Sequence, residues 1–237
     1  MKNDSLGDRM KRYEIVTQQV LMKRTYTVIR VDGKAFHTYT KGLERPFDDK
    51  LMSDMDETAK FLCQNIQNAK MAFVQSDEIS IVLTDFDELE TESWYDNNLQ
   101  KIVSVSASMA TAKFLMLRPY KLVFFDSRVW QLPTRTETIN YLIWRQQDTT
   151  RNSISSVAQS LYPHKELLNK SSDQKQEMIF QKGINWNDYA ARYKRGRVIV
   201  KETVETEKGL RTKWKMVEPP IFTQDRDFLN NIIKLND

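Results

Sequence analysis

The chain is poor in the residues on which disulfides, metal cages and most nucleophilic catalysis depend. Its 237 residues include one cysteine, Cys63, and two histidines. A single cysteine excludes an internal disulfide and a cysteine-rich zinc cage, and it is typical of proteins in a reducing compartment. Long apolar runs are also missing, and the first residues, MKNDSLGDRMKRYE, contain no apolar core of a signal peptide. We therefore expect a cytoplasmic protein with no membrane partner.

Charge is unevenly spread along the chain. The whole sequence has a formal net charge of +4, whereas residues 192–215 carry nine Lys or Arg and three Glu, a net of +6. The remainder is therefore slightly acidic, at 4 − 6 = −2. Clustered Lys and Arg are typical of a surface that faces a polyanion, although a solvated basic hairpin has the same composition.

The first half of the chain alternates between strand and helix patterns. Residues 25–31, 71–83 and 121–133 are rich in β-branched and aromatic residues, and the middle segment is expected to form a tight hairpin around Gln75-Ser76-Asp77-Glu78. Apolar residues at helical spacing predict helices over 48–69 and 99–117. The order βαββαβ predicts an α+β fold with a ferredoxin-like antiparallel sheet, the arrangement also found in polymerase palms.

The second half is expected to be mostly helical before a final hairpin. Helices are predicted over 136–162 and roughly 173–194, the second ending at Gly196, and a basic β-hairpin over 197–217 turns near Glu207-Lys208-Gly209. We therefore expect a palm-like catalytic domain at 1–135 and an RNA-facing C-terminal region of helices and hairpin at 136–237.

Carboxylates are the main candidates for chemistry, since histidine and cysteine are scarce. Asp32 ends the first predicted strand and Asp77 lies at the hairpin tip, and the strands that carry them are neighbours in such a sheet. Two converging carboxylates suit a pair of divalent ions, and Mg²⁺ prefers oxygen ligands. Gly33 has no Cβ, so its backbone can approach an ion or a triphosphate. The Asp32-Gly33 strand end and the hairpin tip with Asp77 are, each on its own, also typical of an ordinary solvated turn.

Four stretches together resemble one known family. RVDGKAFHTYTKG, QSDEISIVL, FDSRVWQLP and YLIWRQQDTTRNSI match, in order and spacing, the D-G-R-x-F-H, Q-S-D-E, F-D-x-R and W-R-Q-x-D patterns of the tRNA-histidine guanylyltransferases and the related Thg1-like proteins. These proteins add nucleotides to RNA in the 3′–5′ direction. The resemblance implies a nucleotidyltransferase that uses two Mg²⁺ ions, ATP and other nucleoside triphosphates, acts on tRNA and forms a homotetramer, a dimer of dimers.

The resemblance also implies roles for individual residues. Asp32, Asp77 and the carbonyl of Gly33 would bind the metal ions, with Glu78 beside them. The nucleotide would be held by the backbone from Gly33 through Lys34, Ala35, Phe36 and His37, together with Arg30 and Arg45. Ser76 and Lys101 fall where the family places catalytic groups. His37 also fits a residue packed within its turn, and Lys101 an ordinary surface lysine.

RNA contacts are expected from the basic segment and from the helix after Trp144. The candidate residues are Lys194, Arg195, Arg197, Arg211, Lys213 and Arg151. Trp144, Arg145 and Asp148 are assigned to helix packing and ion pairing. The chemistry would proceed through 5′-adenylylation of the RNA, followed by attack of the 3′-hydroxyl of an incoming nucleotide with release of AMP.

One departure from the family pattern bears on specificity. Family members devoted to tRNA-histidine carry His-Ile-Asn-Asn where this chain has Thr150, Arg151, Asn152 and Ser153. The missing imidazole favours the Thg1-like class, which repairs 5′-truncated tRNA by copying a template. The alternatives are a guanylyltransferase that adds a single G, a palm-type cyclase or forward polymerase, and a non-catalytic RNA-binding protein.

Overall fold

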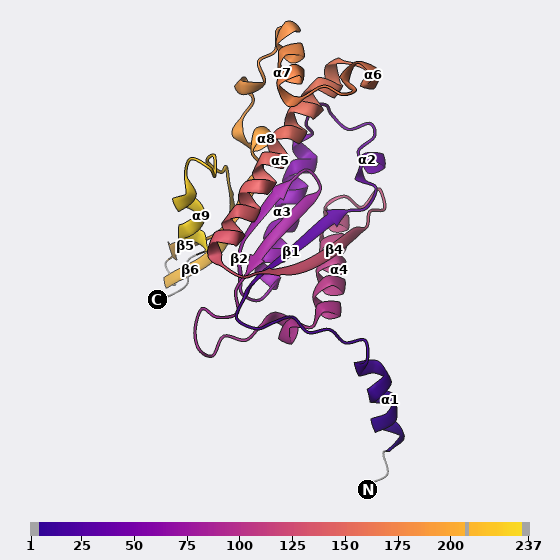
Figure 1. Cartoon of the computed structure of the whole chain (residues 1–237), viewed down its shortest axis with the longest axis vertical. Coiled ribbons are helices and arrows are strands. Elements are labelled where there is room, and N and C mark those ends of the chain that lie inside the picture. The colour runs from indigo at the N-terminus through magenta and orange to yellow at the C-terminus, as the bar shows by residue number, and fades with distance from the viewer. Residues whose placement is uncertain (1–4, 207–208, 234–237) are drawn as a thin grey trace.

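The structure, a computed structural model, describes residues 5–206 and 209–233 (Figure 1). Its centre is a six-stranded antiparallel sheet with the strand order β4-β1-β3-β2-β5-β6. The strands are β1 (Tyr26–Gly33), β2 (Ala69–Gln75), β3 (Glu78–Leu83), β4 (Phe125–Leu132), β5 (Arg197–Thr206) and β6 (Gly209–Val217). The longer helices are α1 (Leu6–Ile15), α3 (Asp49–Asn65), α4 (Leu99–Leu117), α5 (Arg135–Leu161), α7 (Ser172–Gln181) and α9 (Arg226–Ile232). Short helical segments are α2 (Phe36–Tyr39), η1 (Trp94–Asn97), α6 (His164–Leu167), η2 (Trp186–Asp188) and α8 (Ala191–Lys194).

The predicted ferredoxin-like core is confirmed. In chain order β1, α3, β2, β3, α4 and β4 give βαββαβ, and the four strands lie in the order β4-β1-β3-β2. Helices α3 and α4 cover one face, because their apolar residues at helical spacing bury against every second residue of the strands. Ile29, Val31, Ile79 and Ile81 are fully buried in this layer.

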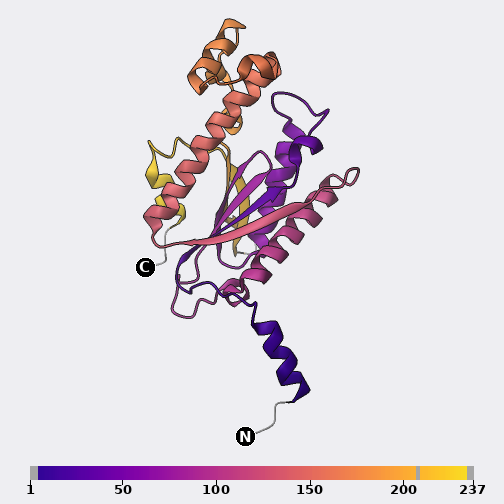
Figure 2. The ribbon, with the colours of Figure 1, turned by 45° about the vertical axis from the view of Figure 1, so that its right-hand side comes forward.

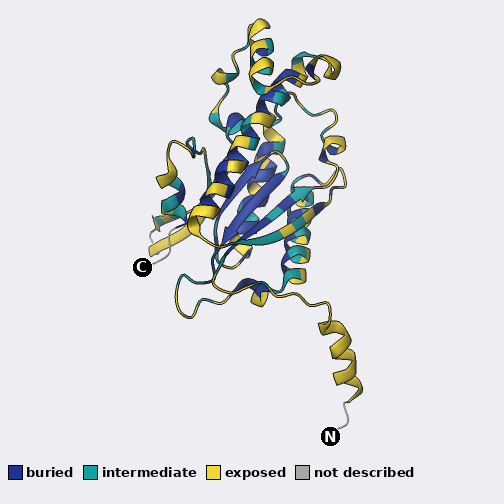
Figure 3. Cartoon of the chain, in the orientation of Figure 1, coloured by how far each residue is buried: buried dark blue, intermediate teal, exposed yellow. Residues whose placement is uncertain are grey.

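The opposite face of the sheet is only partly covered. The long helix α5 crosses it diagonally, and α9 packs beside α5 (Figures 1 and 2). Val28, Phe73, Leu142 and Phe222 belong to the core between these layers. The half of this face that β1 and β4 form carries more exposed residues than the half beneath α5 (Figure 3).

The basic hairpin extends the same sheet. Strand β5 pairs with β2 from Met71↔Val200 to Val74↔Arg197, and β6 pairs with β5. The hairpin is thus continuous with the ferredoxin-like core through backbone hydrogen bonds. Its predicted turn at Glu207 and Lys208 lies outside the described residues.

The prediction of one helix over 173–194 is wrong. Helix α7 ends at Gln181, Gly183 follows with φ +77°, and the chain continues through η2 before α8. A positive φ is the left-handed conformation that ends helices, so Gly183 interrupts the pattern that side-chain spacing alone suggests. The predicted stop at Gly196 is confirmed, since its φ is +78°. Helix α1, which the sequence analysis did not anticipate, is exposed along its length and begins with a Ser5–Asp8 capping box.

No helix among the described ranges 5–206 and 209–233 is both long and apolar enough to cross a membrane.

Gly196 should tolerate alanine far less than Gly42 does. Both have positive φ, but a Cβ at Gly196 would lie 2.6 Å from the Phe73 ring and 2.9 Å from the Val74 carbonyl oxygen, whereas a Cβ at Gly42 meets nothing within 4 Å. We expect Gly42→Ala to lower the free energy of unfolding by about 1 kcal/mol and Gly196→Ala to lower it by about 2–4 kcal/mol. The second substitution adds a steric clash to the backbone strain. Urea unfolding of both variants measures this, and equal costs would contradict the close approach.

Candidate active site

Helix α5 holds the tip of the β2–β3 hairpin through three polar contacts. Tyr141, Arg145 and Thr149 are spaced four residues apart, so they share one face of the helix. The Tyr141 hydroxyl lies 2.8 Å from the Ser80 hydroxyl, Arg145 contacts Glu78, and the Thr149 hydroxyl donates to Gln75 Oε1. All six side chains are buried. The spacing of α5 therefore fixes where the hairpin tip lies.

The central contact is a buried, bidentate ion pair. Arg145 Nε donates to Glu78 Oε1 at 2.9 Å, and Nη2 donates to Oε2 at 2.7 Å. Arg30 Nε lies 4.0 Å from the same carboxylate. Burial raises the pKa of Glu78, while the Arg145 and Arg30 charges lower it. Arg145 also contacts Asp148, at 3.2 Å, which confirms the predicted ion-pairing role of the W-R-Q-x-D segment.

The other two carboxylates lie beside Glu78 without a comparable partner. Asp32 is directly opposite Glu78 on β3 and opposite Asp126 on β4, and the Gly33 amide donates to the Asp77 carbonyl oxygen at 3.2 Å. Burial, with the charge of Asp32 second, raises the pKa of Asp77 to about 6. Burial and then the Asp126 charge raise the pKa of Asp32. The site thus concentrates negative charge that a cation would stabilise.

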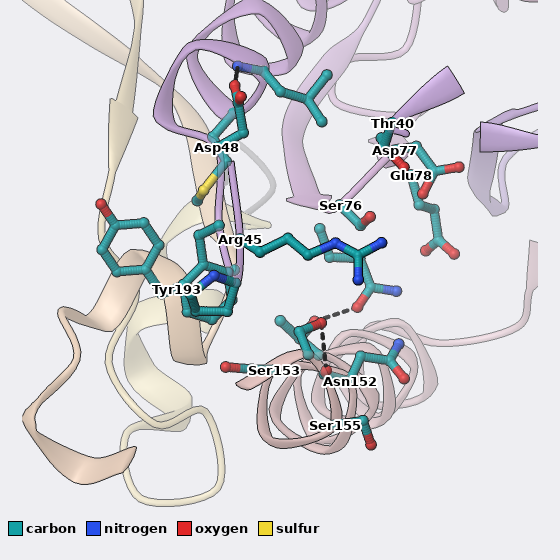
Figure 4. A pocket seen from close by; sticks show the side chains of 18 of the residues that line it. Thr40, Arg45, Asp48, Ser76, Asp77, Glu78, Asn152, Ser153, Ser155 and Tyr193 are labelled. Carbon is teal, nitrogen blue, oxygen red and sulfur yellow. Dashed lines mark hydrogen bonds between the residues drawn. The ribbon is translucent and has the colours of Figure 1, made fainter. Parts of the chain in front are cut away.

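A cleft of about 650 Å³ opens from these carboxylates. One wall is the loop from Thr40 to Asp48, and the other is the middle of α5. Arg45 reaches from the loop across the cleft toward Ser76 and α5 (Figure 4). The cleft therefore joins carboxylates at one end to a cationic and hydroxyl-rich region at the other.

The segment after Gly33 is anchored by an aromatic side chain. A Cβ at Gly33 would lie 2.2 Å from the Phe36 ring, so only glycine fits there. Phe36 is buried against Tyr39, Phe114 and Phe125. The Lys34 amide donates to the Phe124 carbonyl oxygen at 2.8 Å. Ala35 has φ +53° and precedes α2, and His37 is exposed and lines the cleft.

Lys101 is not brought together with the carboxylates. It lies in the first turn of α4, and the 19 residues of this helix span about 27 Å. Asp32 pairs with the first residues of β4, the strand that follows the far end of α4, so the helix separates Lys101 from the carboxylates. Lys101 instead lines a separate open hollow with Glu14, Gln18, Asn98, Gln100 and Ser104. Within one copy of the chain Lys101 does not line the cleft, and its catalytic role stays a prediction.

Two of the predicted RNA-binding residues are not on the surface. Lys194 is buried, its ammonium donates to the Asn187 carbonyl oxygen at 2.5 Å, and burial lowers its pKa. Arg197 is 2% exposed, and its Nε donates to Asp56 at 2.5 Å. The assignment of these two residues to RNA is corrected, because their cationic groups serve internal contacts.

The other predicted RNA-binding residues remain accessible. Arg211, Lys213 and Arg151 are exposed and Arg195 is half-buried. Arg151 Nη2 donates to Asp148 at 2.9 Å, and Lys213 Nζ lies 3.8 Å from Glu202. Their RNA contacts stay a prediction.

Thr150, which replaces the family histidine, faces α8 and does not line the cleft. Its hydroxyl lies 3.1 Å from the carbonyl oxygens of Gln146 and Lys194. Asn152 and Ser153, two and three residues later, do line the cleft. In this chain Thr150 therefore contributes to the contact between α5 and α8.

The sequence analysis missed most of the α5 wall and the residues facing it. The wall is a polar stripe at helical spacing: Asn152, Ser155, Ser156, Gln159 and Ser160. Arg192 and Tyr193 close the cleft from α8. The stripe was a usable signal, because positions i, i+3, i+4, i+7 and i+8 share one helix face. The sequence contains no comparable signal for Arg192 and Tyr193, because their position depends on where the chain leaves α7 and begins α8.

The fold and the strand-end carboxylates together define a nucleotidyltransferase of the palm type. A sequence model of the family described as "Thg1: tRNAHis guanylyltransferase" matches residues 7–133. The tRNA(His) guanylyltransferase of Debaryomyces hansenii is 29% identical over 225 residues, which cover 84% of this chain and 83% of that protein. The chain belongs to the tRNA(His) guanylyltransferase (Thg1) family.

Solved structures agree with this. A bacterial Thg1-like protein in complex with ATP superposes with a TM-score of 0.89 at 46% identity, covering 98% of this chain and all of that one. A bacterial Thg1-like protein in complex with GTP superposes with a TM-score of 0.87 at 47% identity, covering 98% of this chain and 100% of that chain. The expected fold class and the nucleotidyltransferase activity are confirmed, and the non-catalytic RNA-binding alternative is set aside.

Removing Arg145 should destabilise the protein much more than removing Arg151 from the same helix. Arg145→Met leaves the buried Glu78 carboxylate without its main cation, and the loss of one partner of a buried ion pair lowers the free energy of unfolding by about 3–5 kcal/mol. Arg151→Met breaks a largely exposed pair that contributes under about 1 kcal/mol. Chemical denaturation of the two variants gives the comparison. Similar stabilities would show that the pair does not hold α5 on the hairpin.

Proposed function

We propose that the protein adds nucleotides in the 3′–5′ direction to the 5′ end of truncated tRNA, using the opposite strand as template. The RNA 5′-phosphate attacks the α-phosphate of ATP, which forms a 5′-adenylylated end and releases pyrophosphate. The 3′-hydroxyl of an incoming nucleoside triphosphate then attacks that end, and AMP leaves. An RNA that already bears a 5′-triphosphate bypasses the first step.

The cleft supports this proposal because it combines the groups that two phosphoryl transfers need. Both steps require in-line positioning and neutralisation of charge more than a strong base. Asp32 and Asp77 lie at one end, and Arg45 extends over the space between them and α5. We assign Arg45 and Ser76 to the phosphates of the activating nucleotide, since both line the cleft beside the hairpin tip.

Asp32, Asp77 and the Gly33 carbonyl would hold two Mg²⁺ ions. Among residues 5–206 and 209–233, no group of three or more His, Cys, Asp or Glu side chains forms a ready-made metal cage. That fits Mg²⁺, which usually takes one or two carboxylates and completes its shell with water and substrate phosphates. Burial and the charge of Asp32 raise the pKa of Asp77 to about 6, so a cation bound beside Asp77 would stabilise its charged form. When bound, the ions supply charge neutralisation to the phosphates.

The nucleotide triphosphate would contact the backbone after Gly33. In the described part of the chain, the amides of Ala35, Phe36 and His37 donate no hydrogen bond to another backbone group. Successive free amides form a concave site that suits anions. Phe36, packed in the core, holds this turn in place, and Lys34 and His37 lie on its exposed side.

Two observations favour template-dependent repair over addition of a single G. The chain is 46–47% identical to the two bacterial Thg1-like proteins and 29% identical to the curated fungal guanylyltransferase. The position of the family histidine is occupied by Thr150, which is hydrogen-bonded to α8. Template pairing can choose the base where the protein presents only shape and phosphate contacts. Single-G addition to tRNA-histidine remains the second candidate.

The proposal includes assembly as a homotetramer. Helix α1 exposes Leu6, Met10 and Tyr13, at 65%, 46% and 74%, and none of its residues is buried. An apolar stripe of this kind on one helix face is typical of a surface that another chain covers.

The first test concerns the carboxylates. Asp77→Asn should abolish both 5′-adenylylation and nucleotide addition, because it removes a ligand of the proposed ions while conserving shape. RNA affinity should change by less than twofold, since most of it comes from distant Lys and Arg. Asp173→Asn on α7 serves as the control and should retain full activity. Near-normal extension by Asp77→Asn would overturn the site assignment.

The second test compares substrates side by side. Wild-type protein with ATP, the four nucleoside triphosphates and Mg²⁺ should repair a 5′-truncated tRNA faster than it adds G to intact tRNA-histidine. Changing the template base should change the added nucleotide accordingly. If intact tRNA-histidine gains one G much faster and the template base is irrelevant, the single-G candidate is correct.

A further inference from the structure

The open half of the sheet carries a row of aromatic rings that the reaction scheme does not use. On β4, Ser127 and Val129 face α4 and the core behind the sheet, so Asp126, Arg128 and Trp130 face the other side. Figures 1 and 3 show this side of β1 and β4 uncovered next to α5.

Trp130 begins a continuous row of rings that ends in solvent. Its ring centroid lies 5.2 Å from that of Tyr141, and the Tyr141 centroid lies 5.9 Å from that of Trp144. Tyr141 is buried and hydrogen-bonded to Ser80, whereas Trp144 is 48% exposed. The row thus presents a large flat side chain at the surface, supported from below by fixed rings.

Cations flank both ends of the row. The Arg145 guanidinium lies 4.6 Å from the Trp144 ring centroid, and that of Arg30 lies 5.7 Å from the Trp130 ring centroid. Arg30 Nε is buried and has no hydrogen-bond partner in the described chain. Arg128, directly opposite Arg30 across the β1–β4 pair, is 59% exposed, and its Nε lies 3.5 Å from the similarly accessible Asp126 carboxylate. Aromatic rings interleaved with arginines are typical of surfaces that bind single-stranded nucleic acid.

The row also lies beside the carboxylates. Arg30 and Arg128 precede Asp32 and Asp126 by two residues on the same face of the sheet, and Arg145 binds Glu78 directly. Trp144 is therefore connected to the carboxylates through Arg145, which lies between its ring and Glu78, the residue opposite Asp32. In a truncated acceptor stem, the strand opposite the missing nucleotides is unpaired at that point.

We propose that an unpaired nucleotide of the template strand stacks on Trp144, with Arg128 and Arg30 contacting the adjacent phosphates. The proposal rests on the proposed function for the identity of the RNA, and on the aromatic row for the surface. Trp144 is a binding residue for the templating strand, and it holds that strand in place while the 5′ end reacts.

The test measures RNA binding without catalysis. Fluorescence anisotropy gives the Kd of three RNA hairpins: one with a short unpaired 3′ extension, the same hairpin with blunt ends, and one whose extension carries abasic residues. Trp144→Leu should weaken binding of the first hairpin about tenfold, as the loss of one base–aromatic stack does. It should leave the other two within twofold. Trp144→Tyr should bind all three nearly as the wild type does.

Controls separate stacking from folding and assembly. Phe180→Leu, at a 64% exposed aromatic on α7, should change none of the three affinities, and thermal melting should show Trp144→Leu folded. The proposal is overturned if Trp144→Leu binds every hairpin as the wild type does, or weakens all three equally. It is also overturned if the variant changes only the oligomeric state, because the ring then belongs to a contact between copies.

Failure of the stacking surface and failure of the proposed function can be told apart. A protein that extends no 5′ end but shows the expected pattern of affinities contradicts the activity and leaves the stacking surface intact. A protein that repairs truncated tRNA while Trp144→Leu is silent contradicts only the stacking surface.

Discussion

The buried contact between Arg145 and Glu78 joins the two halves of the chain at the point where the chemistry is expected. Glu78 begins β3 in the ferredoxin-like core, and Arg145 lies 67 residues later in α5. Two charged groups out of water stabilise each other only when their geometry is good and their hydrogen bonds are satisfied. The bidentate arrangement meets that condition, and with the Gln75–Thr149 and Ser80–Tyr141 contacts it sets the position of the cleft wall.

That pair also decides how charge is distributed in the site. Arg145 hydrogen-bonds Glu78, and although Arg30, Arg128 and Arg145 also lower the pKa of Asp32, burial and the charge of Asp126 outweigh them. Asp32 and Asp77 therefore remain as neighbouring carboxylates with raised pKa values. The result is local electrostatic strain that a divalent cation and a triphosphate can relieve together. Asp32, Asp77 and the Trp144–Gln146 segment therefore lie together in the fold, although they are far apart in the sequence.

Much of the fold could be predicted from local patterns, because the alternation of strands and the helical spacing of apolar residues determine the ferredoxin-like core. The convergence of Asp32 and Asp77 followed from that topology. The errors arose where local patterns are ambiguous: Gly183 interrupts a helix whose spacing reads as continuous, and Lys194 and Arg197 look like surface cations until tertiary packing buries them. The position of Thr150 toward α8 depends on the path of the broken helix, which no short-range pattern contains.

The account depends most directly on cation binding by Asp32 and Asp77 and not by Glu78. Titration of the protein with Mn²⁺, a paramagnetic substitute for Mg²⁺, measures bound ions by the loss of the free-ion electron paramagnetic resonance signal in the presence of a non-hydrolysable nucleoside triphosphate. We predict binding by the wild type and by Asp126→Asn, and strongly reduced binding by Asp32→Asn and Asp77→Asn. Wild-type Mn²⁺ affinity in Asp77→Asn would contradict the account.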